Sequence, residues 1–101
     1  MNKEYRTNFE FEEDEKPKII VRVRNLLGKE QKFRIMPNEK VERLNALVHK
    51  TFEISPRLQC LVYEGVILEV GKKVSDYQIK NNSLIKLIIN WLFWNINNHR
   101  Y

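Results

Sequence analysis

The side chains that most often catalyse reactions or bind metals are few and scattered in this sequence. It contains one cysteine, Cys60, and two histidines, His49 and His99, none of which has the spacing of a metal site or a catalytic triad. It also contains no glycine-rich loop of the kind that holds phosphate groups. We therefore predict a protein that is not an enzyme, with no catalytic residues, no metal site, no cofactor and no small-molecule substrate.

Charge divides the 101 residues into segments of opposite sign, although the net charge is +5. Residues 1–17 hold three basic and six acidic side chains, a balance of −3, and we interpret them as an acidic, flexible arm. Residues 18–90 hold 14 basic and seven acidic side chains, a balance of +7. The arm and the basic domain are therefore expected to attract each other weakly, through an interaction that salt screens.

The expected compartment follows from the cysteine count and the hydropathy. A single cysteine cannot form an internal disulfide, and residues 1–16 contain no apolar stretch typical of a signal peptide. The longest apolar run, 84–96, is interrupted by polar residues and is shorter than the roughly 20 residues that span a bilayer. We expect an intracellular protein, cytoplasmic or nuclear, with no membrane span; an organellar assembly stays open.

Alternating hydrophobic residues at the start of the basic segment predict a β-hairpin. Ile19, Val21 and Val23 share one face of a first strand, and Phe33 and Ile35 share one face of a second. Gly28 lies between the two strands, where a turn requires a positive φ.

Past the hairpin, hydrophobic residues recur every three or four positions instead of every second one. Val41, Leu44 and Val48 follow the spacing of an amphipathic helix, and Ser55-Pro56 is predicted to end that helix. Short extended segments and a last strand over 84–89 follow. Residues 18–90 therefore predict an α+β fold in which one helix packs across a mixed sheet of four to five strands.

Turn and core residues along this stretch match a known family. They are Leu27-Gly28-Lys29, Pro37, Ile54 with Pro56, Gln59 to Leu61, Gly65, Leu68-Glu69, Gly71, and Ser75-Asp76-Tyr77 followed by Ile79. On these residues the stretch 19–89 resembles the ubiquitin family, which implies a β-grasp fold. The positions that match the family's core are Ile19, Val21, Val23, Phe33, Ile35, Val41, Leu44, Val48, Leu61, Leu68, Val74, Ile79, Ile85 and Leu87.

Two positions depart from the family's pattern inside the domain. Gln31 is polar where the resemblance places a core residue. Lys40 takes the place of the usual Ser or Thr before the helix, so we expect a helix start without a side-chain cap.

Ubiquitin-like modifiers are joined to lysine side chains through a C-terminal Gly-Gly. Here Ile89 is followed by Asn90-Trp91-Leu92-Phe93-Trp94, and no Gly-Gly pair occurs in the sequence. We therefore expect a chain that does not conjugate, and a role as a modifier of other proteins is the least favoured interpretation.

The resemblance also implies a recognition surface on the outer face of the sheet. The residues that match the family's apolar patch are Leu26, Val62 and Ile88, with Lys86 in place of the family's histidine. Grouped on one sheet face, these side chains favour a protein-binding patch over ordinary exposed surface.

Basic residues surround this patch on the predicted strands: Arg22, Arg24, Lys32 and Arg34, together with Lys86. They form either a solvated face or a site for an acidic protein or a nucleic-acid backbone. No aromatic residue is interleaved with them on their own face of the strands, since Phe33 points to the opposite face, which makes a nucleic-acid partner the weaker alternative.

An aromatic extension, residues 91–101, follows the last predicted strand. It contains Trp91, Leu92, Phe93 and Trp94, which are too many large side chains for so small a core. They either fold back over an edge of the domain or dock onto a partner, and Trp and Phe are residue types common in interface hot spots. We favour docking, and predict a protein-binding module that is a small subunit or adaptor of a larger assembly.

Overall fold

The computed structural model of the chain describes residues 17–90. All of the acidic arm except Pro17, and the whole aromatic extension with Trp91, Leu92, Phe93 and Trp94, lie outside the described residues.

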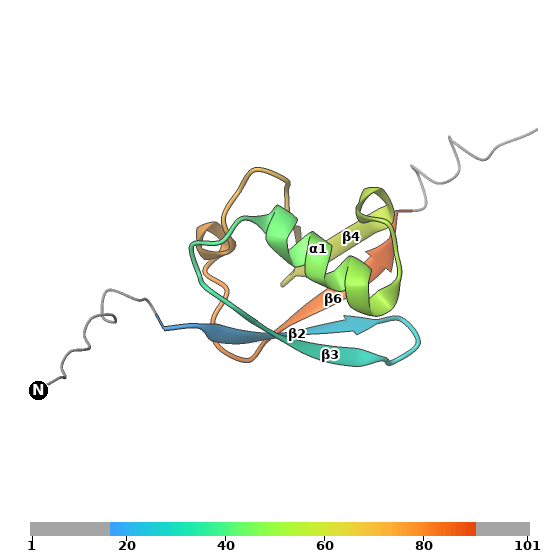
Figure 1. Ribbon diagram of the computed structural model, residues 1–101, viewed down its shortest axis with the longest axis horizontal. Coiled ribbons are helices and arrows are strands. Elements are labelled where there is room, and N and C mark those ends of the chain that lie inside the picture. Colours follow the sequence, from blue (N-terminus) through green and yellow to red (C-terminus); the bar gives the residue numbers. More distant parts are fainter. Residues whose placement is uncertain (1–16, 91–101) are drawn as a thin grey trace, which may run out of the picture.

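The described residues form a five-stranded sheet with one α-helix across it (Figure 1). The strands are β2 (Ile19–Asn25), β3 (Glu30–Ile35), β4 (Gln59–Tyr63), β5 (Val66–Ile67) and β6 (Ser83–Ile89), and the helix is α1 (Val41–Phe52). Two short 3₁₀ helices, η2 (Pro56–Leu58) and η3 (Val74–Tyr77), lie in the connections.

The sheet is mixed, because β2 and β6 run parallel to each other. The strand order is β3-β2-β6-β4-β5; β2 pairs with β6 in parallel, and every other pair of neighbouring strands is antiparallel. The predicted α+β architecture is confirmed, and the arrangement is that of a β-grasp fold.

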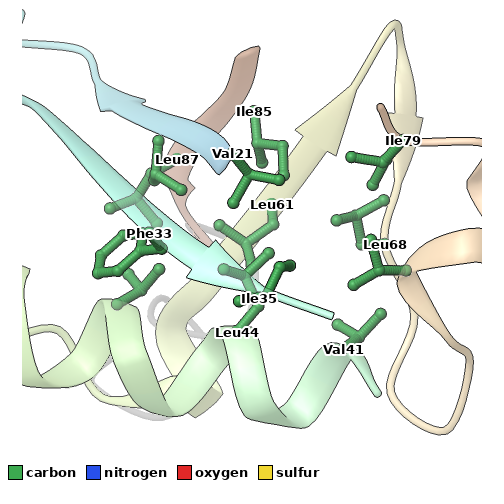
Figure 2. Packing of buried hydrophobic residues seen from close by; sticks show 13 residues of the cluster. Val21, Phe33, Ile35, Val41, Leu44, Leu61, Leu68, Ile79, Ile85 and Leu87 are labelled. Carbon is green, nitrogen blue, oxygen red and sulfur yellow. The ribbon is translucent and has the colours of Figure 1, made fainter. Parts of the chain in front are cut away.

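The core lies between α1 and the face of the sheet that the helix covers (Figure 2). Val21 and Val23 from β2, with Ile85 and Leu87 from β6, are fully or almost fully buried there, as their alternation predicts. All of the predicted core positions are buried except Ile19, which is partly buried and packs against the cluster.

Two local features differ from the sequence-based expectations, one in the burial of a strand residue and one in the end of the helix. Gln31 is exposed, because β3 reaches the hairpin end there and only Phe33 and Ile35 of this strand are buried. The helix ends at Phe52 rather than at Ser55-Pro56, since Glu53 adopts the left-handed conformation with φ 61° and its N–H bonds to the carbonyl of His49.

The start of α1 has no side-chain cap, as expected from the sequence. Lys40 is extended at the N-cap position with φ −79° and ψ 157°, and its side chain accepts no bond from the first turn.

One polar side chain, Gln59, is buried at the edge of the core. Its amide group donates to the carbonyls of Asn45 and Ile54, both at 2.9 Å, and its Oε1 accepts from the Asn45 side chain at 2.8 Å. Gln59 thereby ties β4 to the middle of α1 and to the loop that follows the helix.

The substitution Gln59→Leu is expected to lower the free energy of unfolding by about 1–3 kcal/mol, because it removes the side-chain donor from two partly buried carbonyl groups and the acceptor from the Asn45 amide. Chemical denaturation measures the change. Gln31→Leu is the matched control, since Gln31 is exposed and its side chain makes only a 3.4 Å bond to the adjacent Lys32 carbonyl. Equal losses for the two variants would show that the Gln59 bonds contribute nothing.

Candidate functional site

The candidate site is the outer face of the sheet, opposite α1. A row of directly paired positions crosses all five strands of this face: Glu30, Arg24, Lys86, Val62 and Ile67. Paired residues on neighbouring strands point to the same side of a sheet. The row therefore passes from charged side chains on β3, β2 and β6 to aliphatic side chains on β4 and β5.

The rows on either side extend this division. Arg22 lies between Lys32 on β3 and Leu84 on β6, and Cys60 on β4 pairs with Ile88 on β6. We call one part of the surface the apolar half, consisting of Cys60, Val62, Ile67, Leu84 and Ile88. Ile67 is 56% exposed, and the other four are half-buried.

The basic half consists of Arg22, Arg24, Lys32 and Arg34. Glu30 lies among these residues: Arg24 donates to its Oε1 through Nε at 3.0 Å and Nη2 at 2.8 Å, and Arg22 approaches its Oε2 at 3.7 Å. The hydrogen bonds from Arg24 hold the pKa of the Glu30 carboxyl below its ordinary value. Within residues 17–90, Lys32 and Arg34 have no ion-pair partner, so their charges face solvent.

Lys86 lies at the boundary of the two halves. It is exposed, and it pairs with Arg24 on one side and with Val62 on the other. The structure thus brings together Val62, Lys86 and Ile88 of the predicted patch, and places the four predicted basic residues beside them.

Leu26, the other predicted patch residue, lies in the turn after β2, one position beyond the pair of Asn25 with Leu87. It is 77% exposed and lines a groove of about 210 Å³ at this end of the sheet. The other residues that line the groove are Asn25, Leu27, Ile54, Leu87 and Ile89. The place of Leu26 in the binding patch stays a prediction.

One member of the outer face could not be found from sequence pattern alone. Ile67 lies on a strand of two residues, which is too short for any alternation to be recognised. Alternation along the second strand places Glu30 on the outward face with Lys32 and Arg34, but only the register of β2 against β3 pairs it with Arg24.

The residues with catalytic or metal-binding potential stay apart in the described part of the chain. His49 is exposed on α1, and Cys60 is half-buried on the outer sheet face. Among residues 17–90 there is no group of three or more His, Cys, Asp or Glu side chains that could hold a metal ion. No helix in this range combines the length and the apolar character that crossing a membrane requires.

Comparison with known proteins agrees with the fold. The family model described as "Ubiquitin family" matches residues 21–91, which is most of the chain. The chain belongs to the ubiquitin family. The match includes every strand of the sheet and α1, except for the first two residues of β2.

The similar proteins include members of the family from distant organisms. The chain is 31% identical over 71 residues to ubiquitin-like protein 1 of Schizosaccharomyces pombe. The aligned residues cover 70% of this chain and 91% of that protein. It is 30% identical over 71 residues to ubiquitin-like protein NEDD8 of Dictyostelium discoideum, covering 70% of this chain and 92% of the relative.

A third relative is considerably longer. Ubiquitin-like protein 4B of Monodelphis domestica is 37% identical over 67 residues, which are 66% of this chain and 37% of that protein. The chain thus matches less than half of this relative.

Proposed function

We propose that this ubiquitin-family chain is a non-enzymatic, non-conjugating protein-binding module, a small subunit or adaptor of a larger assembly. It docks through the outer sheet face, with a patch of Leu26, Val62, Lys86 and Ile88, and through the large apolar side chains of Trp91, Leu92, Phe93 and Trp94. The observation that carries the proposal is the direct pairing of half-buried Val62 with exposed Lys86 on one side and exposed Ile67 on the other, which places aliphatic and cationic side chains next to each other.

The composition of this surface supports a protein partner. Aliphatic side chains on adjacent strands provide area that is removed from water on binding, and the adjacent cations select for acidic groups at the rim of an interface. The sequence after the last strand supports docking without conjugation, because Ile89 is followed by Asn90 and four large apolar residues where the family's modifiers carry a flexible Gly-Gly tail.

A nucleic-acid partner that binds the basic half is the alternative, and it has less support. Glu30 accepts hydrogen bonds from Arg24 within the basic half, and a carboxylate there repels a phosphate backbone. The aliphatic side chains beside the basic half also offer no aromatic surface on which bases would stack.

Substitutions in the two halves distinguish these partners. In a pull-down from the native cell followed by affinity measurement on the captured partner, Val62→Ala with Ile88→Ala is expected to weaken protein binding about 10-fold or more, with little dependence on salt. Lys32→Glu with Arg34→Glu is the matched pair in the basic half and is expected to act mainly on the association rate.

The opposite pattern would reject the proposal. Four phosphate contacts would make affinity fall roughly 100-fold between 50 and 200 mM salt, and the basic pair of substitutions would then abolish binding to a single-stranded oligonucleotide. A partner whose affinity is unchanged by Val62→Ala with Ile88→Ala would equally exclude the outer face as the binding surface.

A further inference from the structure

The outer sheet face has an occupant of matching chemistry within the same chain. Residues 9–15 read Phe-Glu-Phe-Glu-Glu-Asp-Glu, which is five acidic side chains and two aromatic ones with no basic residue among them. The face presents the same two properties in complementary form, since four cations lie on β2 and β3 and five small or aliphatic side chains lie on β6, β4 and β5. Acidic groups suit the basic half, and phenyl rings suit the apolar half.

Residues 9–15 join the sheet close to the basic half of the outer face. Ile20 pairs with Arg34, so the chain enters β2 at the corner of the sheet where Arg34 lies, and only Lys16, Pro17 and Lys18 separate Glu15 from Ile19. Pro17 and Lys18 are exposed and belong to no strand or assigned turn, and the segment before them reaches the outer face only when the chain reverses direction at this point. A chain that reverses at Pro17 runs back across the outer face, antiparallel to β2.

The extended length of residues 9–15 is sufficient to cross the outer face. From Ile20 to Arg24, β2 covers roughly 13 Å, and the six steps from Glu15 back to Phe9 cover roughly 20 Å when extended. The acidic run 12–15 therefore reaches Arg34, Lys32 and Arg22 first, and residues 9–11 reach the row of Lys86 and Val62.

We propose that residues 9–15 of this chain bind its own outer sheet face, with the acidic run on the basic half and Phe9 and Phe11 on the apolar half. A protein partner that uses the same face must displace this segment. The proposal concerns the chain alone and does not depend on the identity, or the existence, of such a partner.

Paramagnetic relaxation tests the contact in the full chain. Asn8→Cys in a Cys60→Ala background carries a nitroxide label, and ¹H–¹⁵N spectra record which amide signals lose intensity. We expect selective loss at Lys86, Val62 and Ile88, with signals from Arg43 and Ala46 on the exposed face of α1 unchanged. The effect is expected to disappear at 1 M salt, where the screening length falls to about 3 Å.

Charge variants provide the matched comparison. Glu13→Gln with Asp14→Asn is expected to reduce the loss of signal strongly, whereas Glu64→Gln with Glu69→Gln, which removes two exposed charges outside the arm, leaves it unchanged. The unlabelled chain serves as a second readout that needs no cysteine substitution. In it the arm variant should shift the amide signals of Arg22, Lys32 and Lys86.

Three outcomes would overturn the proposal. These are a loss of signal that spreads evenly over the domain or includes α1, a loss that is insensitive to the arm charges, and a loss that arises between labelled and unlabelled chains in a mixture. The last outcome would assign the contact to a second copy of the chain.

Discussion

A chain truncated after Asn90 is expected to fold and to lose its partner. Among residues 17–90, every buried core residue lies between Val21 and Leu87, and the bond from the Asn90 N–H to the Leu58 carbonyl, 2.7 Å long, is retained. Burial of each large aromatic side chain at an interface is worth roughly 1.5–3 kcal/mol. Loss of two such anchors is therefore expected to weaken binding about 100-fold or more, while the melting temperature changes little.

The matched control is truncation after Trp94, which removes residues 95–101 and keeps Trp91, Leu92, Phe93 and Trp94. It is expected to bind as the full chain does. Thermal denaturation and affinity for the captured partner are measured on all three chains.

A large fall in melting temperature on truncation after Asn90 would contradict docking of the extension. The groove lined by Leu26, Ile54 and Ile89 then provides the explanation, because its lining is mostly apolar and includes Ile89, which directly precedes Asn90. The aromatic side chains would in that case pack on their own domain.

The substitution Leu44→Ala is expected to destabilise the domain by about 2–5 kcal/mol. Leu44 is fully buried in the middle of the inner face of α1, and it points into the space where Ile35 and Leu61 also lie (Figure 2). For a domain of this size, the loss corresponds to a fall in melting temperature of roughly 10 °C or more. Since small domains are stable by only about 5–15 kcal/mol, the substitution removes a large share of the free energy of unfolding.

His49→Ala on the exposed face of the same helix is the control, and it is expected to change the stability by no more than about 0.5 kcal/mol. Calorimetry or denaturant titration measures both variants. If Leu44→Ala cost no more than His49→Ala, α1 would not pack on the sheet as described.

Much of the fold follows from the sequence, because hydrophobic periodicity is a local property of the chain. The alternation through Val21, Val23, Phe33 and Ile35 predicts two strands and identifies their buried faces, and the structure confirms both. The spacing of Val41, Leu44 and Val48 likewise identifies the buried face of α1.

The ends of helices and strands are predicted less well from local pattern than their buried faces. Glu53 ends α1 in a left-handed conformation that sequence reasoning assigns to glycine. The end expected at Ser55-Pro56 therefore lies a few residues after the observed one. Gln31 follows the inward alternation of β3 and is nevertheless exposed, because burial depends on whether the core extends to that end of the strand.

The sequence by itself determined which residues have the chemistry of a binding face, and the tertiary structure decided how they are grouped. Parallel pairing of β2 with β6 joins segments about 60 residues apart and sets Arg22 beside Leu84 and Arg24 beside Lys86. The same registers pair Glu30 with Arg24 and add Ile67 to Val62, and the turn after β2 makes Leu26 part of the lining of a groove at the end of the sheet. Residue types fix the charge and hydropathy of each strand, but pairing between strands distant in sequence depends on how the whole sheet packs against α1. Only that packing divides the outer face into a basic half and an apolar half.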